Sequence, residues 1–394
     1  MNYNSTFNKV KHYQLMIAKV KELRKELHQH PECSGAEIET ASRIKSFISK
    51  YHPTKILDNL GGNGLAAIYE YSDQGPTIAI RCELDALPIV EKNRFAHRSR
   101  NNGVSHKCGH DGHMAIVAGL IFWIKEQNFI SGKIVLLFQP AEETGKGAAK
   151  VLADSRFSEL KIDYIFALHN IPGVPLHTII YTKQGFSAEV QSLAVYLKGK
   201  ESHASEPENG INPSTAIAEI TTKLKELGLD DPNEDNFAIL TPIHILMGQK
   251  SYGISPANGE IHYTIRTWSP ERMQKLKLEI ENVCKQICHS NSLEYKIDWF
   301  EYFPASINND HCNTLVQSAI KNNKLKAIAR TYPFRFGEDF GWYSRSYKVA
   351  MFGLGAGMHT PALHHSDYDF PDELLTTGMD MFKAIIAETL NSSN

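Results

Sequence analysis

The stretch from Ser105 to Ala115, SHKCGHDGHMA, places one cysteine and three histidines within eight residues. Thiolate and imidazole groups are strong ligands for Zn²⁺ and similar ions, and metal binding keeps such a thiol deprotonated. The Cys-x-His pair formed by Cys108 and His110 fits a metal site no better than it fits a buried thiol beside a loop histidine. A complete metal shell therefore needs donors from elsewhere in the chain.

A second chemical feature is the pair of adjacent glutamates, Glu142 and Glu143, which ends the apolar run KIVLLFQPAEE. Two carboxylates at the end of a buried run are costly unless their charge is compensated, although a strand that leaves the core for solvent also explains them. Beside a metal ion the two can divide the work. One carboxylate binds the ion, and the other accepts a proton from the water that the ion activates.

Later histidines supply the remaining candidate donors. His169 ends the apolar run YIFALHN, and His364 and His365 lie in LHHSDYDF. Each of them alone is read more simply as a strand-end or loop residue. Together with the Cys-x-His pair and one glutamate, His169 and one late histidine give five donors, which exceeds a closed four-ligand zinc site and could hold two ions.

The elements around these residues predict how they come together. Apolar spacing predicts helices over residues 13–29, 37–51 and 113–127, and strands over residues 65–71, 77–84, 133–143 and 164–170. Such alternation predicts an α/β fold, with helices on both faces of a mostly parallel sheet. Because sites in open α/β sheets form at the carboxyl ends of strands, the distant donors are expected to meet at one edge.

The middle of the chain follows a different pattern. From residue 188 to about residue 303 the predicted order is β-α-β-β-α-β, which is typical of a ferredoxin-like domain. We therefore predict a discontinuous first domain, residues 1–185 and 300–394, interrupted by an inserted domain over residues 186–299.

Composition excludes several function classes. The 42 lysines and arginines nearly balance the 44 aspartates and glutamates, so no bulk charge favours nucleic acid or an anionic membrane as a partner. No window approaches the ~18 uninterrupted apolar residues of a membrane span, and the first residues lack the apolar core of a signal peptide. The six scattered cysteines do not form a secreted disulfide framework. These observations predict a cytoplasmic location.

Six motifs together, LHQHPECSGAE, AIRCELDALPIVE, KCGHDGHMA, FQPAEE, ALHN and LHHSDYDF, resemble the amidohydrolases that cleave N-acyl amino acids. That family includes hippurate hydrolases, bacterial aminoacylases, N-acetyl-diaminopimelate deacetylases and plant hydrolases of auxin conjugates, within a wider group of metallopeptidases. The resemblance runs in order from about residue 20 to residue 380. It implies a dinuclear-metal α/β domain interrupted by a ferredoxin-like lid, with two divalent ions (Zn, Mn, Ni or Co) per chain.

The resemblance also implies roles for particular residues. The metal ligands of the family fall on Cys108, His110, Glu143, His169 and His364. Its general base falls on Glu142, and an acidic residue that orients the site falls on Asp85.

Two further positions lie in the inserted domain. The segment KGKESHASEP places His203 where the family stabilises the oxyanion, and YTIRT places Arg266 where a basic residue binds the substrate carboxylate. Without the resemblance, both residues are read as solvated surface of the lid. Its exposed sheet edge or its helices are also candidates for a homodimer interface.

Four residues depart from the family pattern. They are Glu83 and Asn212, where aspartate is common, Gly253, where asparagine is frequent, and Ser366, where proline is usual. None of them removes a ligand or the base, so the departures bear on substrate preference.

The sequence thus predicts a metal-dependent amidohydrolase that cleaves the amide bond of small N-acyl-L-amino acids to a carboxylate and a free amino acid. The closest alternative is a metallo-carboxypeptidase or dipeptidase that uses the same site. The motifs are also compatible with a metal-free thiol hydrolase that uses Cys108 as nucleophile, and with a catalytically silent relative.

Overall fold

The computed structural model describes residues 3–183 and 185–391. The chain divides into two compact units, which are described separately below. The first comprises Met1–Phe186, Ser306–Thr331 and Asp339–Asn394, and the second comprises Ser187–Ala305 and Tyr332–Glu338. The second unit thus extends beyond the insertion predicted over residues 186–299, and the assignment of the units as catalytic domain and lid stays a prediction.

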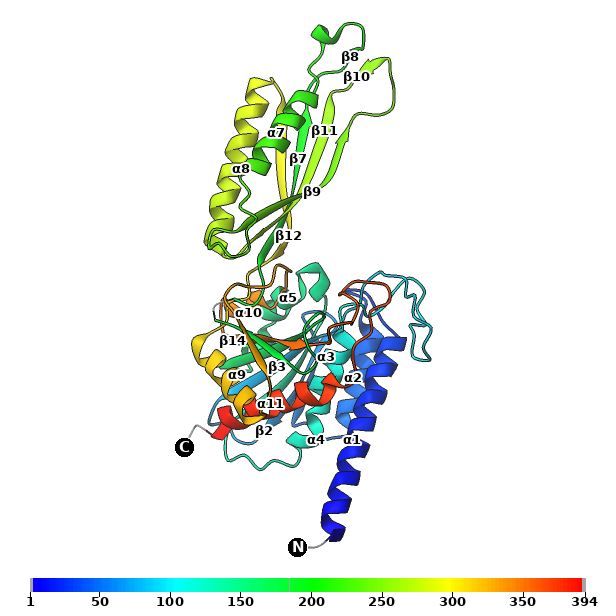
Figure 1. Ribbon diagram of the computed structural model, residues 1–394, viewed down its shortest axis with the longest axis vertical. Helices are drawn as coiled ribbons and strands as arrows, with labels where there is room; N and C mark the ends of the chain where they lie inside the picture. Colours follow the sequence, from blue (N-terminus) through cyan, green and yellow to red (C-terminus); the bar gives the residue numbers. More distant parts are fainter. Residues whose placement is uncertain (1–2, 184, 392–394) are drawn as a thin grey trace. The chain divides into compact units, whose positions relative to one another are not determined.

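An eight-stranded, mostly parallel sheet forms the centre of the first unit (Figure 1). Its strand order is β1-β2-β4-β3-β5-β14-β6-β13. Strands β4, β3, β5 and β14 run parallel to one another, β2 is antiparallel to both β1 and β4, and β6 is antiparallel to β14 but parallel to β13. The strands are β1 (Lys55–Leu60), β2 (Gly64–Glu70), β3 (Thr77–Glu83), β4 (Lys133–Gln139), β5 (Tyr164–Ile171), β6 (Ile179–Thr182), β13 (Ala327–Arg330) and β14 (Lys348–Gly355).

Helices flank this sheet, as predicted. They are α1 (Tyr3–Gln29), α2 (Ile38–Ser49), α3 (His110–Gly119), α4 (Ile121–Ile124), α5 (Gly147–Ala153), α6 (Ser155–Ser158), α9 (Asp310–Asn322), α10 (Gly341–Ser344) and α11 (Leu374–Asn391). The main core joins apolar residues of α1, α2, α3, α9 and α11 to alternate residues of the strands, such as Ile78 and Ile80 of β3. Since successive strand residues point to opposite faces, Arg81 lies on the other side of the sheet, beside Phe340.

Several predicted elements end elsewhere in the structure. The strand predicted over residues 133–143 stops at Gln139, and a short 3₁₀ turn, η1 (Glu142–Thr144), carries the paired glutamates instead. The helix predicted from residue 113 begins at His110 and, as α3, ends at Gly119. The short strands β1, β6 and β13 were not predicted, because runs of four to six residues carry little periodicity.

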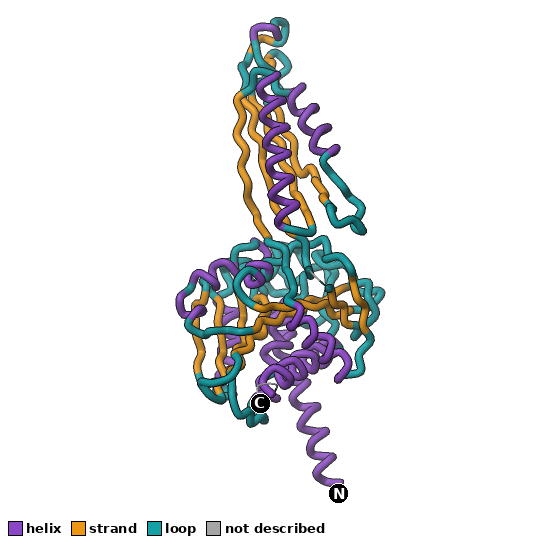
Figure 2. The backbone as a smooth tube through the Cα atoms, turned by 90° about the vertical axis from the view of Figure 1, so that its left-hand side faces the viewer, coloured by secondary structure: helices purple, strands orange, loops and turns teal. Residues whose placement is uncertain are grey.

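The second unit is an antiparallel four-stranded sheet with two helices on one face. Figure 2 shows the helices on one side of the strands, and the strand order is β12-β7-β11-β9. The elements are β7 (Glu189–Lys198), β8 (Ser202–His203), η2 (Pro207–Asn209), α7 (Ser214–Glu226), β9 (Ala238–Met247), β10 (Ile254–Ser255), β11 (Asn258–Thr267), α8 (Pro270–Ser290) and β12 (Glu294–Phe303). Disregarding the short β8 and β10, this order confirms the predicted ferredoxin-like fold. Within residues 3–183 and 185–391, every helix is too short or too polar to cross a lipid bilayer.

Candidate metal centre

The loop that carries Cys108 is joined to α3 by Gly109, a position that no other residue could occupy without strain. Gly109 precedes α3 with φ +97°, and a Cβ there would lie 2.5 Å from Oδ1 of Asn170. This backbone conformation favours glycine, and the close contact excludes a side chain. Cys108 therefore ends the loop and His110 opens α3, and both side chains are buried.

The paired glutamates are positioned by a tight turn after β4. Ala141 adopts the left-handed conformation with φ 52°, and its N–H donates to Oε1 of Glu37 over 2.9 Å. At Gly147 a Cβ would meet the carbonyl oxygen of Pro140 at 1.6 Å, so the chain there also requires glycine. The turn carries Glu142 into the core, with its carboxylate accepting from the backbone N–H of Asp339 over 3.3 Å.

The structure brings together all five residues that the sequence nominated as ligands. One group of donor atoms comes from Cys108, His110 and His169, and a second comes from Cys108, Glu143 and His364. Within each group the donor atoms lie within 4.8 Å of one another, and the thiol of Cys108 belongs to both. Its Sγ lies 3.5 Å from Nε2 of His169. Two groups of three donors that share one thiol are an arrangement suited to two neighbouring ions.

The carboxylate of Glu143 belongs to the second group and also approaches the first. Its Oε1 is 3.9 Å from Nε2 of His110 and 3.9 Å from Nε2 of His364. Glu142 also faces His110, with 3.9 Å between Oε2 and Nε2. Glu143 therefore contacts donors of both groups. Glu142 faces His110 with one carboxylate oxygen, and its other oxygen accepts from the backbone N–H of Asp339.

Hydrogen bonds outside the cluster orient the histidine rings. Nδ1 of His110 donates to the carbonyl oxygen of Asp85 over 2.8 Å, and Nδ1 of His169 donates to that of Asn170 over 2.9 Å. With the proton on Nδ1, each ring directs the lone pair of Nε2 into the cluster, as metal ligation requires. The carboxylate of Asp85 also accepts from the backbone N–H of Glu143 over 2.9 Å, so this one residue contacts two of the predicted ligands, one on α3 and one on η1.

Two observations test whether a cation fits the cluster. Among residues 3–183 and 185–391, no group forms a hydrogen bond with the buried Nε2 of His110, a state that is costly unless another partner binds there. Burial lowers the pKa of His110, but the carboxylates of Glu83, Glu143 and Asp85 outweigh it and raise that pKa to about 9. The same carboxylates favour a metal cation. The donor set therefore fits divalent metal ions.

His113, the third histidine of the motif, has both ring nitrogens engaged elsewhere. Nδ1 lies 2.7 Å from Oε2 of Glu83, and Nε2 lies 2.6 Å from Oδ1 of Asn170. Glu83, where the resemblance suggested aspartate, is fully buried and also bonds Arg81. Glu83, at the end of β3, thus connects His113 of α3 to Arg81 of β3, which gives this departure from the family pattern a structural role.

A buried ionic network behind the Cys/His loop was missed from the sequence. Nδ1 of His28 lies 2.8 Å from Oδ2 of Asp111, and its Nε2 lies 2.9 Å from Oε1 of Glu91. Arg24 binds Asp369 over 2.7 Å and also contacts Asp111. The available signal was the spacing of Arg24 and His28, which lie four residues apart on the buried stripe of α1.

This network predicts a pH dependence of stability. Burial lowers the pKa of His28, but Asp111 and Glu91 raise it to about 9 in the folded state. Since the unfolded value is about 6.5, the folded state binds more protons between these pH values, and stability falls as pH rises through that window. We expect His28→Gln to destabilise the protein most below pH ~6.5, with on the order of 3 kcal/mol of that difference lost by pH ~9.

The difference in the free energy of unfolding between the wild type and His28→Gln is measured by urea unfolding at several pH values, with chelator present. The matched control is His12→Gln, which removes an exposed imidazole from the same helix and is expected to follow the pH profile of the wild type. A His28→Gln effect that is constant from neutral to alkaline pH would show that the His28 ring is not charged in the folded protein.

Two nominated residues belong to the second unit, and the structure describes each in its own surroundings. His203 is exposed on β8, and its Nδ1 accepts from the backbone N–H of Ser205 over 3.1 Å. Because Nδ1 accepts, the proton of the neutral ring lies on Nε2, which is left as a donor. Arg266 is half-buried and donates to the carbonyl oxygen of Arg335 over 2.7 Å. Burial and Arg335 lower its pKa.

Fold and cluster together define a metal-dependent hydrolase. The chain belongs to peptidase family M20/M25/M40, whose family model matches residues 79–388. This confirms the family predicted from the motifs, and the chain is thus a hydrolase.

Individual relatives agree with this assignment. The chain is 34% identical over 322 residues to the N-acetyl-L-cysteine deacetylase of Bacillus subtilis strain 168, covering 82% of this chain and 76% of the relative. It is 30% identical over 376 residues to an N-acetylcysteine deacetylase of the same organism, covering 93% and 97%. A crystal structure of a Bacillus subtilis protein described as a dinuclear metal binding peptidase from the M20 family superposes with a TM-score of 0.83. That protein is 26% identical, and 96% of this chain and 99% of that chain are covered.

Proposed function

We propose that the protein is an amidohydrolase that cleaves small N-acyl-L-amino acids to a carboxylate and a free amino acid. The observation that carries the proposal is the cluster of two donor groups sharing Cys108, with the buried carboxylate of Glu142 facing it. The two deacetylases at 34% and 30% identity act, by their names, on N-acetylcysteine, which supports an N-acetyl amino acid as substrate.

Two divalent ions would be held by five side chains. These ligands are Cys108, His110, Glu143, His169 and His364. When bound, such ions supply Lewis acidity, which lowers the pKa of water and polarises an amide carbonyl. Zn, Mn, Ni and Co all suit this mixture of thiolate, imidazole and carboxylate.

Glu142 is proposed as the general base. Its carboxylate is buried, one oxygen is fixed by the N–H of Asp339, and the other faces His110. It accepts the proton of the attacking water and then passes that proton to the nitrogen of the departing amino acid, so that each bond cleavage leaves the carboxylate unprotonated.

Two residues of the second unit are proposed to act on the substrate. Nε2–H of His203 is free to donate to the oxyanion that forms at the amide carbon, since Nδ1 is held by Ser205. The guanidinium of Arg266 would bind the substrate carboxylate. The support for His203 is the tautomer of its ring, and the support for Arg266 is the charge of its guanidinium. Both are observed within the second unit alone, and both positions match the family motif.

A substrate panel tests the reaction class. Purified protein is treated with chelator, reloaded with Zn²⁺, Mn²⁺, Co²⁺ or Ni²⁺, and assayed on N-acetyl-L-cysteine, other N-acetyl and N-benzoyl amino acids, and dipeptides. We expect metal-dependent release of free amino acid from an N-acetyl substrate and little from dipeptides. A preference for dipeptides would assign the chain to the carboxypeptidase class, and activity that survives chelation would remove the metal from the mechanism.

A further inference from the structure

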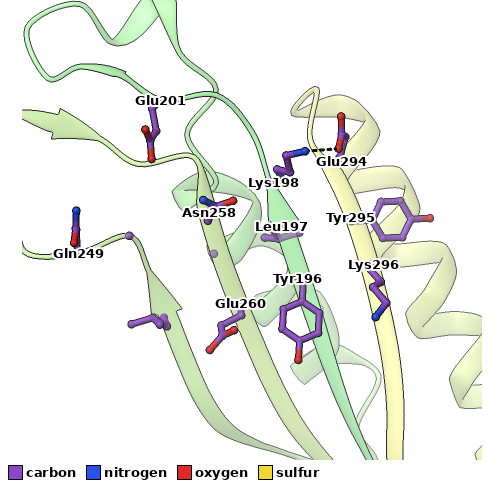
Figure 3. Close-up of a pocket in the computed structure, with 13 residues that line it drawn as sticks. Tyr196, Leu197, Lys198, Glu201, Gln249, Asn258, Glu260, Glu294, Tyr295 and Lys296 are labelled. Atoms are coloured by element: carbon purple, nitrogen blue, oxygen red, sulfur yellow. Dashed lines mark hydrogen bonds and ion pairs between the residues drawn. The ribbon is translucent and has the colours of Figure 1, made fainter.

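The face of the second unit's sheet that the helices leave uncovered carries a cluster of its own. On β11, Ile261 and Tyr263 are buried against α7 and α8, so Glu260 and His262 point to the opposite face. His262 lies directly across from His244 of β9 in the strand register. Glu260 precedes His262 by two residues on β11 and therefore points to the same face. Figure 3 shows Glu260 beside Tyr196 of the neighbouring strand, at a hollow on this face.

Both histidines direct a ring nitrogen toward the same carboxylate oxygen of Glu260. Nε2 of His244 lies 3.4 Å from Oε1 of Glu260, and Nε2 of His262 lies 3.7 Å from the same oxygen. Ligands about 2.0–2.1 Å from a tetrahedral Zn²⁺ lie about 3.4 Å from each other. The two separations therefore correspond to ligand pairs around one ion, and the second is too long for a hydrogen bond.

His262 gives a second, independent indication. Its Nε2 is buried, and among the residues that the structure describes no group forms a hydrogen bond with it. The rings of Tyr196 and Phe300 lie edge-on to the His262 ring, with centroids 6.0 Å and 6.5 Å away. A buried imidazole nitrogen without a hydrogen bond is costly, and an ion between it and Glu260 would satisfy it.

We propose that His244, Glu260 and His262 bind one Zn²⁺ ion, separate from the candidate metal centre of the first unit. Two imidazoles and one carboxylate leave the fourth position of a tetrahedral ion open to water. The side chain of His244 is 51% exposed, against 24% for His262 and 30% for Glu260, so the ion enters past His244. Since β9 is the edge strand, the ion ties the edge of the sheet to β11.

Metal stoichiometry tests the proposal. Wild type, His244→Ala and His262→Gln are dialysed to equilibrium against micromolar free Zn²⁺, and bound zinc is measured by mass spectrometry. We expect each variant to bind one equivalent less than the wild type, with kcat unchanged once the active site is loaded. The matched control is His289→Ala, which removes an exposed histidine from α8 and leaves the zinc content unchanged.

Cobalt loading distinguishes the two metal sites without reference to activity. The site of the first unit contains a thiolate, so its Co²⁺ form shows a sulfur-to-metal charge-transfer band, whereas the site on the sheet contains no sulfur. We expect His244→Ala to lower the ligand-field absorption and leave the charge-transfer band intact. Equal zinc content in the wild type and the folded His244→Ala variant would overturn the proposal, and would show that the three residues form an ordinary cross-strand ion pair.

Discussion

We expect Glu142→Gln to lower kcat by a factor of about 10²–10⁴ while leaving the metal content unchanged, because this is the usual contribution of a general base. The substitution preserves the size of the side chain and its contact with the N–H of Asp339, but removes its ability to accept a proton. Glu143→Gln is the matched comparison, since Oε1 of Glu143 faces histidines of both donor groups.

The two variants separate the roles of the paired glutamates. We expect Glu143→Gln to lose both metal and activity, and excess metal to restore part of the activity. Glu142→Gln is expected to stay inactive at any metal concentration. Metal content is measured by mass spectrometry and turnover with the best substrate of the panel. If Glu142→Gln lost as much metal as Glu143→Gln, or kept most of its turnover, the assignment of Glu142 as the base would be wrong.

The second large effect concerns stability. Arg81 is buried on β3, where its guanidinium bonds Glu83, Oδ1 of Asp339 over 2.7 Å and Oε1 of Gln139 over 2.9 Å. We expect Arg81→Met to lower the free energy of unfolding by about 3–5 kcal/mol, because methionine leaves two buried carboxylates without their cation. Arg81 of β3 and Gln139 of β4 both bond the carboxylate of Asp339, which precedes α10. The backbone N–H of Asp339 in turn donates to Glu142.

Urea unfolding with chelator present measures this change, so that metal binding does not contribute. Lys45→Met is the matched control, since Lys45 pairs with Asp58 at the surface, and the expected change is about 0–1 kcal/mol. An Arg81→Met variant as stable as the wild type would show that the buried carboxylates become protonated at little cost.

The parts of the site that lie in continuous motifs could be predicted from the sequence. Cys108 and His110 are two residues apart, and the paired glutamates follow one apolar run, so residue type and spacing indicated their chemistry directly. The order of strands and helices likewise indicated both sheets. The exact ends of the elements depend on contacts such as that of Ala141 with Glu37, which local periodicity does not carry.

Long-range ion pairs could not be predicted, because nothing in the local sequence indicates their partners. Arg81 pairs with Asp339, 258 residues later, and Arg24 pairs with Asp369, 345 residues later. The triad on the second sheet was missed for a similar reason. His244 and His262 become neighbours only through the register of β9 and β11, and a shift of one residue would place them on opposite faces.

The position of β14 in the sheet has a consequence for biosynthesis. β14 (Lys348–Gly355) lies between β5 and β6, which are separated from it in the sequence by the whole second unit. During translation, β5 and β6 therefore emerge from the ribosome long before the strand that joins them. When Ser187–Ala305 has been synthesised, β5 still lacks its neighbour β14, and β6 lacks both β14 and β13. Such unpaired strand edges are prone to aggregation. His364 follows β14 in the chain, so the last of the five proposed metal ligands is synthesised after every strand of the central sheet.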